Sequence, residues 1–150
     1  MGHTFSRLLY HIVFSTKDRR PALARDLRKE LFPYLHGVLE NEGGHLLKGG
    51  GAEDHIHLLV VAKPTHAPAE LVRTIKANSS RWIHGRNPDL KGFAWQTGYG
   101  AFSVSESRAS KVVAHIERQQ EHHRRVPYAE ELRLLLEKHG ATYDPQHYLD

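Results

Sequence analysis

Two spacings of hydrophobic residues alternate along the first half of the chain, one typical of strands and the other of helices. Residues 7–16 are rich in aromatic and β-branched side chains and end at a polar run, which predicts a strand. Residues 21–43 carry leucines at spacings of three and four, which predicts an amphipathic helix that is kinked at Pro33 and ended by two glycines. Residues 45–64 predict a hairpin made of a short strand, a glycine turn and a longer strand.

The second half of the chain repeats this alternation and then becomes helical. We expect a helix over residues 68–84, a strand interrupted by glycines over residues 93–105, a helix that runs to about residue 125, and a last helix over residues 128–139. The order strand, helix, strand, strand, helix, strand predicts an α+β fold with a ferredoxin-like antiparallel sheet (βαββαβ) and C-terminal helices. Residues 1–150 are expected to form a single domain.

The composition limits the chemistry that this fold can carry. The sequence has no cysteine, so disulfides and thiolate metal sites are excluded, and a metal would need His, carboxylate, amide or hydroxyl ligands. The net charge of +4 favours a polyanionic partner, because Lys and Arg gain affinity by releasing counterions from phosphates. No apolar run approaches the roughly 18 residues of a membrane span, and the first residues lack a secretory pattern, so we expect a cytoplasmic protein without membrane association.

A pair of histidines stands out among the thirteen in the sequence. The segment EDHIHLLVV places His55 and His57 one residue apart at the start of the longer hairpin strand. Because side chains alternate across a strand, both imidazoles face the same way, about 7 Å apart at Cα, and could share one cation. The alternative is two polar residues on an exposed sheet face. The apolar residues that follow indicate a central strand, which seldom carries two imidazoles without a partner.

A further ligand is available in the segment VVAHIERQQEHHRR, which is predicted to be helical. His115 and Gln119 lie four residues apart and project from one face of a helix, and His122 and His123 follow one turn later. A helix packed against the sheet would present these side chains to the cation. The sequence therefore predicts a metal site where this helix meets the two strand histidines.

Four stretches of the chain resemble one known family. They are HIVFSTKDRRP in and after the first strand, EDHIHLL around the paired histidines, FAWQTGYGAFSVS before the long helix and IERQQEHHRR within it. Together they are similar to the HUH-type single-tyrosine transposases of the insertion-sequence 200/605 kind, which include the REP-associated tyrosine transposases. The resemblance covers nearly the whole chain. It implies an RRM-like antiparallel sheet and a homodimer with composite active sites, in which a helix of one subunit completes the site of the other.

The resemblance also implies roles for individual residues. His55 and His57 match the family's paired metal ligands, and Gln119 matches its helical ligand. The cation, Mg²⁺ or Mn²⁺, would polarise a scissile phosphate in hairpin-bearing single-stranded DNA. The family's nucleophile is a tyrosine four residues before this glutamine, which forms a 5′-phosphotyrosyl link, and this chain has His115 at that position.

The replacement of the tyrosine leaves three interpretations of His115 open. It could be the nucleophile, although a phosphohistidine link is more labile; it could add a ligand to the cation beside Gln119, which is the interpretation we favour; or it could fill space near the sheet. Tyr99 and Tyr128 are the tyrosines nearest in sequence, but neither lies on the helical face of His115 and Gln119.

We therefore predict a transposase-like protein that cleaves and rejoins DNA strands in DNA transposition. The alternative is a catalytically inactive, domesticated DNA-binding protein that recognises palindromic repeats. Two other classes fit the residues less well. The triple-histidine phosphoesterases need a third alternating histidine where this chain has Leu59, and RNA-binding RRM modules need an aromatic-rich RNP stretch that this sequence lacks.

Basic residues gather where elements are expected to end, which suits contacts with phosphates. The expected nucleic-acid-binding residues are Lys17, Arg19, Arg20, Arg73, Lys76, Arg81, Arg124 and Arg125. A single strand that crosses the sheet could stack its bases on Trp95, Tyr99 or Phe102. Taken alone, each charge is more typical of a solvated helix face, and Trp95 and Phe102 are as typical of a core.

Overall fold

The computed structural model describes residues 2–150, apart from the side chains of Gln120 and Arg124. Its centre is an antiparallel sheet in the order β2-β3-β1-β4. The strands are β1 (Leu8–Ser15), β2 (His45–Gly51), β3 (His55–Ala62) and β4 (Gly100–Val104). The predicted α+β class and the ferredoxin-like order of elements are confirmed, and β3 is a central strand as its apolar sequence indicates.

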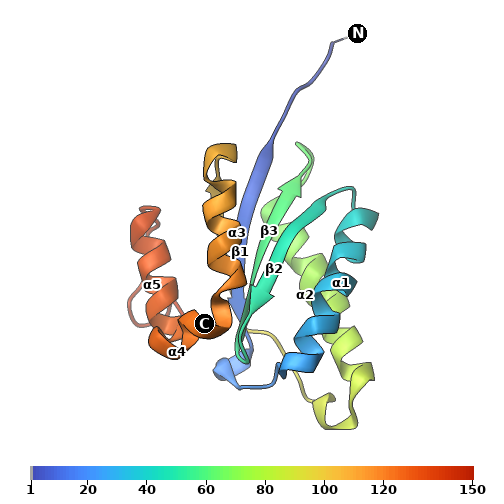
Figure 1. Ribbon diagram of the computed structural model, residues 1–150, viewed down its shortest axis with the longest axis vertical. Coiled ribbons are helices and arrows are strands. Elements are labelled where there is room, and N and C mark those ends of the chain that lie inside the picture. The colour runs from blue at the N-terminus through green and yellow to red at the C-terminus, as the bar shows by residue number, and fades with distance from the viewer. Residues whose placement is uncertain (1) are drawn as a thin grey trace.

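Helices cover both faces of this sheet (Figure 1). On one face lie α1 (Arg25–Asn41) and α2 (Pro68–Arg86). On the other lie α3 (Ala109–Glu117) and α5 (Tyr128–Lys138), which α4 (Gln119–Arg125) connects. Short 3-10 turns cover Lys17–Arg19, Pro88–Leu90 and Glu106–Arg108. The sheet is therefore enclosed between two helical layers.

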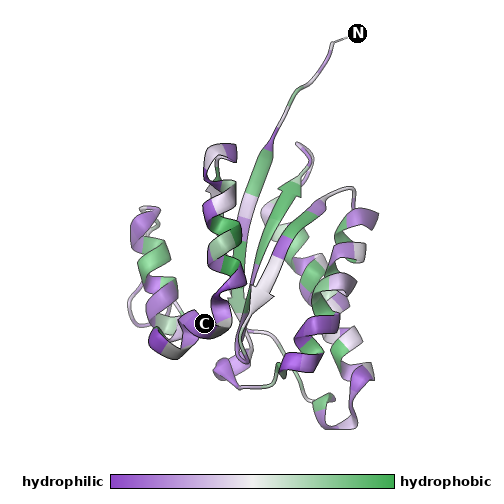
Figure 2. Ribbon diagram, viewed as in Figure 1, coloured by the Kyte–Doolittle hydropathy of each residue, from purple (hydrophilic) through white to green (hydrophobic). Residues whose placement is uncertain are grey.

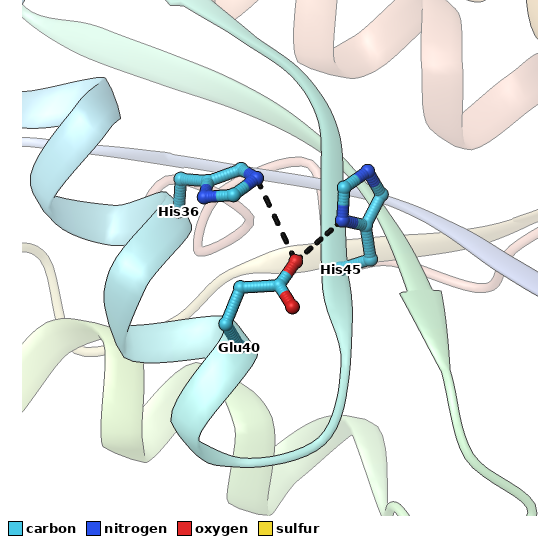
Figure 3. A group of neighbouring side chains, drawn as sticks. All are labelled: His36, Glu40 and His45. Carbon is cyan, nitrogen blue, oxygen red and sulfur yellow. Dashed lines mark hydrogen bonds and ion pairs between the residues drawn. The ribbon is translucent and has the colours of Figure 1, made fainter.

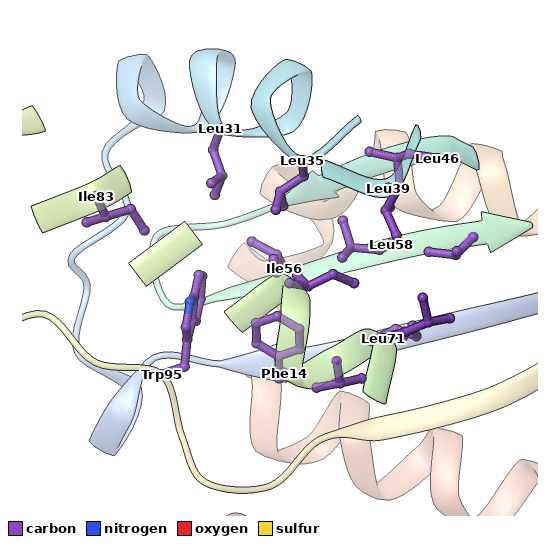
Figure 4. Close-up of a cluster of buried hydrophobic side chains, with 14 of the residues drawn as sticks. Phe14, Leu31, Leu35, Leu39, Leu46, Ile56, Leu58, Leu71, Ile83 and Trp95 are labelled. Carbon is purple, nitrogen blue, oxygen red and sulfur yellow. The ribbon is translucent and has the colours of Figure 1, made fainter. Parts of the chain in front are cut away.

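The alternation of side chains along the strands divides the core into two parts. Phe14 on β1 and Ile56 and Leu58 on β3 point towards α1 and α2 and form the larger apolar cluster (Figure 4). Leu9 and Leu59 point to the opposite face and pack against α3. β1 and β3 are largely hydrophobic, whereas the helices carry both hydrophobic and hydrophilic residues (Figure 2). Among the described residues, no helix combines the length and the apolar character that crossing a membrane requires.

The glycines of the hairpin have a different role from the predicted one. Gly49 and Gly50 lie within β2, and the turn falls at residues 52–54 instead. A Cβ at Gly50 would lie 2.4 Å from the backbone oxygen of Ile116 and 2.8 Å from its Cγ2. Glycine is needed here because α3 packs directly on the backbone of β2, which brings α3 close to the sheet.

The predicted helix up to residue 125 is divided in two. α3 ends at Glu117 and α4 begins at Gln119, and Arg118 between them has φ −96° and ψ 13°. Pro33, by contrast, lies inside α1, which continues past it to Asn41. Because of the break at Arg118, the relation between α3 and α4 side chains does not follow regular helical spacing.

We expect Gly50→Ala to lower the free energy of unfolding by roughly 1–3 kcal/mol, because the added methyl group would collide with α3. The matched control is Gly37→Ala in α1, where an added Cβ meets no atom within 4 Å. This control should stabilise the protein by about 0.5–1 kcal/mol, the difference between alanine and glycine in a helix. Urea unfolding followed by circular dichroism measures both, and equal stabilities for the two variants would contradict the close packing of α3 on β2.

Candidate metal centre

Two buried imidazoles form the floor of a polar cluster between the sheet and α3–α5. His55 and His57 are neighbours on one face of β3, and both are 0% exposed. His55 Nε2 lies 2.9 Å from Oε1 of Gln119, at the start of α4. The structure thus brings the three predicted ligands together, and it does so within one chain. The composite site that the resemblance implies would instead take its helix from a second subunit.

The centre of the cluster is a residue that the sequence reasoning missed, Glu131 on α5. Its carboxylate is 3% exposed. Oε1 lies 2.9 Å from His57 Nε2 and 3.0 Å from His115 Nε2, and it accepts a hydrogen bond of 3.0 Å from Nε2 of Gln119. Oε2 lies 3.6 Å from His55 Nε2. Glu131 therefore faces every residue that was expected at the metal site.

Three side-chain atoms are buried without a hydrogen-bond partner among the described residues; one is Nδ1 of His123, a residue beside Asp54, and the other two are ligand atoms of this cluster. These two are His57 Nε2, whose short approach to Glu131 is not aligned as a hydrogen bond, and Glu131 Oε2. Buried polar atoms without partners are rare, because each one costs free energy on folding. A cation bound between His55, His57 and Glu131 would satisfy both atoms, and the ligand atoms of these residues all lie within 4.8 Å of one another. The residues fit a divalent metal.

The other nitrogen of each imidazole has a partner that orients the ring. Asp54 Oδ1 lies 2.7 Å from His55 Nδ1, and His11 Nε2 lies 2.7 Å from His57 Nδ1. A proton on each Nδ1 would leave the Nε2 lone pair free for a cation, which is the usual role of such partners in metal sites. Asp54 and His11 thus complete the outer shell of the candidate site.

The electrostatics of the cluster favour a neutral His57 and an ionised Glu131, and they raise the pKa of His55. Burial lowers the pKa of His11 to about 3 and the pKa of His57 to about 4, so both are neutral at pH 7. Burial opposes ionisation of Glu131, but the contacts from His115 and His57 hold the pKa of Glu131 below its usual range. Burial also lowers the pKa of His55, but hydrogen bonds to Asp54 and Gln119 outweigh it and the pKa is raised. Because a proton and a metal would compete for Nε2 of His55, metal affinity should fall as the pH falls.

His115, at the position of the family's tyrosine, lies at the edge of this cluster. Its side chain is 37% exposed, and its ring centroid is 5.7 Å from that of His57 and 5.0 Å from that of His122. Its Nε2 is directed at Glu131, as the interpretation of an additional ligand requires.

Neither of the nearby tyrosines offers a free hydroxyl beside the cluster. The ring of Tyr128 packs 4.9 Å from that of His55, but its hydroxyl donates to Gln96 Oε1 at 3.2 Å. Burial raises the pKa of Tyr128, so its phenol is a poor nucleophile. Tyr99 is exposed and lies beside Lys76 on the α2 side of the sheet.

Of the predicted basic residues, Arg19 and Arg125 lie near the cluster. Lys17, Arg19 and Arg20 are exposed in and after the turn that ends β1; Lys17 and Arg20 line a hollow with residues 89–94, whereas Arg19 lies near Tyr128. Arg19 has a φ of 55°, a left-handed conformation that a non-glycine residue rarely adopts. Arg125 lines a hollow of about 420 Å³ together with His115 and His122. The side chain of Arg124 lies outside the described residues.

The predicted basic residues of α2 lie on the opposite face. Arg73 is exposed and paired with Glu70, and Arg81 is also exposed. Lys76 instead donates from Nζ to the backbone oxygens of residues 96–98, at 2.7–3.1 Å. Burial lowers its pKa to about 8. Since an ammonium group has three N–H donors, Lys76 has none left for a phosphate and acts as a tie between α2 and the loop before β4.

Two of the three aromatic residues considered for base stacking belong to the core. Trp95 is buried and donates from Nε1 to Ser79 Oγ at 2.9 Å (Figure 4). Phe102 is buried and stacks on His139, with ring centroids 4.6 Å apart. Of the three, Tyr99 alone is exposed.

A second group of potential ligands lies away from this cluster, where α1 meets β2. His36 and Glu40 are one turn apart on α1, and His45 begins β2 (Figure 3). Glu40 Oε1 lies 2.5 Å from His45 Nδ1 and 3.6 Å from His36 Nε2. All three are exposed, so these contacts also have a simple interpretation as surface ion pairs that join α1 to β2.

Comparison with known proteins gives a consistent set of relatives. Residues 4–119 match the family model described as "Transposase IS200 like". The chain is 28% identical over 118 residues to the ISDra2 transposase TnpA of Deinococcus radiodurans. The aligned region covers 75% of this chain and 84% of that protein. It is 29% identical over 126 residues to the transposase for insertion sequence element IS200 of Salmonella typhimurium, which covers 81% of this chain and 82% of that protein.

Solved structures show the same architecture. The crystal structure of a putative transposase from Deinococcus radiodurans superposes with a TM-score of 0.61 at 27% identity, over 80% of this chain and 97% of that one. A REP-associated tyrosine transposase bound to a REP hairpin superposes with a TM-score of 0.57 at 12% identity, over 79% of this chain and 70% of that one. The second likeness concerns the fold alone.

Proposed function

Because this chain belongs to the IS200-like transposase family, we propose that it binds hairpin-bearing single-stranded DNA and cleaves and rejoins that strand with the help of a divalent cation. The observation that carries the proposal is the convergence of His55, His57 and Gln119 on one buried carboxylate. The hairpin substrate is carried over from the REP-associated relative, whose structure holds a REP hairpin.

The cation would be held by His55, His57, Gln119 and Glu131. Imidazole nitrogens suit transition metals, whereas carboxylate and amide oxygens suit Mg²⁺ and Mn²⁺, so this mixed set favours Mn²⁺ over Mg²⁺. Such a cation acts as a Lewis acid on a phosphoryl oxygen. The chain's own contribution is to hold the two imidazoles in one orientation through Asp54 and His11. It also keeps His57 neutral and Glu131 ionised.

The DNA would be held by exposed basic residues after β1 and beside the cluster. Lys17, Arg19 and Arg20 line one end of β1, and Arg125 lines the hollow beside His115. Phosphate contacts of this kind position the strand without reading its sequence. Arg73 and Arg81 on α2 are solvent-exposed and could extend the contact surface to a hairpin stem.

A second candidate function is a DNA-binding protein that does not cut. One specific observation favours it: His115 stands where the family has its nucleophilic tyrosine, and the hydroxyl of the neighbouring Tyr128 is buried against Gln96. The homodimer of the family remains part of the proposal. In a dimer with composite active sites, the helix that carries Gln119 would complete the site of the other subunit, in place of the contact that Gln119 makes with His55 within one chain.

The test is a cleavage assay on an end-labelled single strand that carries a hairpin, with Mn²⁺ and with Mg²⁺. We expect cleavage by the natural protein and a loss of about 10–100-fold in Gln119→Ala, the range typical of losing a residue that supports a metal site. Gln146→Ala, in an exposed C-terminal turn, is the matched control and should be unaffected. Tight hairpin binding without cleavage would favour the non-cutting alternative, and absence of both binding and cleavage would overturn both functions.

A further inference from the structure

The carboxylate of Glu131 faces two pairs of histidines at once. On one side are the buried His55 and His57 of β3, and on the other are His115 of α3 and His122 of α4. Oε1 lies 2.9 Å from His57 and 3.0 Å from His115, and Oε2 lies 3.6 Å from His55 and 4.0 Å from His122. Each pair, taken with Glu131, has ligand atoms that all lie within 4.8 Å of one another.

We propose that this chain binds two divalent cations, with Glu131 bridging them and His115 and His122 holding the second one. The inference rests on the proposed function for the first cation, which His55, His57 and Gln119 hold. The four imidazoles do not form one group around Glu131: His55 and His57 form one group with its carboxylate, and His115 and His122 form another. A carboxylate between two cations uses both of its oxygens, and Oε2 has no hydrogen-bond partner among the described side chains.

The break between α3 and α4 lets both outer histidines face Glu131. His115 and His122 are seven residues apart, and their ring centroids lie 5.0 Å apart at an angle of 66°. Arg118, with non-helical backbone angles, redirects the chain between them. On an uninterrupted helix, residues seven apart share a face but lie about 10 Å apart along the axis, so the break at Arg118 is what lets the two rings approach to 5.0 Å.

The second cation would lie at the edge of a solvent-filled hollow. His115 and His122 line this hollow of about 420 Å³ with the basic Lys111, Arg118 and Arg125 and with Glu121, which is paired with Arg125. Their side chains are 37% and 31% exposed, whereas His55 and His57 are fully buried. Because the basic rim repels a cation and attracts a phosphodiester, the second ion should bind more weakly than the first and should bind more tightly when DNA phosphate is present.

The second site gives His115 the role of a metal ligand at the position of the family's tyrosine. A second cation next to the first would contact the same phosphodiester, as in two-metal sites that act on phosphate esters. The second site would therefore take a divalent ion that accepts two imidazoles and a carboxylate. Mn²⁺ is the practical probe because its unpaired electrons can be observed.

The experiment measures Mn²⁺ bound to the full-length chain by equilibrium dialysis and electron paramagnetic resonance. We expect two ions per chain, one tight and one weak, and a spin-coupled signal when both are bound. His122→Ala should lose the weak ion and keep the tight one. If His122→Ala does not fold, the more conservative His122→Gln should give the same result. His57→Ala should lose the tight ion. Circular dichroism checks that each variant is folded.

The control variant is His45→Ala, which removes a ligand from the exposed group at the start of β2. It should leave both ions in place. If the weak ion is lost in His45→Ala and kept in His122→Ala, it binds at the surface group and the inference is overturned. A single ion that His122→Ala does not affect also overturns the inference but leaves the proposed function intact, whereas no bound ion at all contradicts both.

Discussion

Replacing Glu131 by glutamine should lower the rate of metal-dependent DNA cleavage by about 100-fold or more, since the change removes the only charge among the proposed ligands of the first cation. Glutamine has nearly the same shape as glutamate, so the packing of α5 on the sheet is retained. The amide would offer an N–H donor where a cation needs an anionic oxygen. Single-turnover cleavage of the end-labelled hairpin strand and Mn²⁺ affinity are the two measurements, and both should fall together.

The control for this prediction is the neighbouring residue. Glu130 precedes Glu131 in the sequence but is exposed and paired with Arg133, so Glu130→Gln should leave cleavage and Mn²⁺ affinity unchanged. Hairpin binding in the absence of metal should be the same in both variants, because Glu131 is too deeply buried to touch DNA. Cleavage at the natural rate in Glu131→Gln would show that the carboxylate is only a structural part of the cluster.

The fold was predictable because two periodicities, of strands and of helices, are both strong in this chain. The alternation in β3 puts Ile56 and Leu58 in the core beneath α1 and α2 and leaves His55 and His57 on the other face. The glycines of β2 were misread as a turn, because a close approach by α3 and a chain reversal both call for glycine. Which of the two applies depends on a contact between segments far apart in sequence.

The sequence predicted the site residues that belong to a local pattern, namely the paired histidines of β3 and the pair His115 and Gln119, four residues apart. His11 was missed because its contact with His57 depends on the pairing of β1 with β3, and no local pattern fixes that register. The sequence does contain a pattern that indicates a special role for Glu131. Tyr128, Glu131 and Leu132 share the buried face of α5, so a glutamate occupies an otherwise apolar helical stripe. A charged residue in such a stripe needs a partner, and here the partners are the histidines.

The exposed basic residues show a different limit. Composition indicates a polyanionic partner, but it does not tell a free lysine from one that is used within the fold. Lys76 donates hydrogen bonds to three backbone oxygens, whereas Arg19 and Arg20 are exposed after β1. The sequence alone does not distinguish these basic residues. Whether Lys76 is free depends on the path of the loop before β4, whose backbone oxygens accept its hydrogen bonds.

His115→Tyr should create a covalent protein–DNA adduct that survives denaturing electrophoresis, whereas any phosphohistidine link of the natural protein is more labile and should not survive it. The imidazole of His115 already lies beside Glu131 and His57, so a phenol at this position would reach into the same cluster. A phenol oxygen next to a cation can attack phosphorus and retain the strand end as a phosphotyrosyl link. Denaturing gel electrophoresis of labelled hairpin DNA with Mn²⁺ detects the adduct.

His115→Phe is the matched control for this gain of function, because it supplies the same ring without the hydroxyl and should form no adduct. Both variants lose one ligand of the second cation, so a difference between them reports on the hydroxyl alone. If His115→Tyr binds Mn²⁺ and hairpin DNA but forms no adduct, residue 115 does not face the scissile phosphate. A stable adduct with the natural protein that disappears in Tyr128→Phe would instead make Tyr128 the nucleophile, which would require α5 to move so that the hydroxyl leaves Gln96.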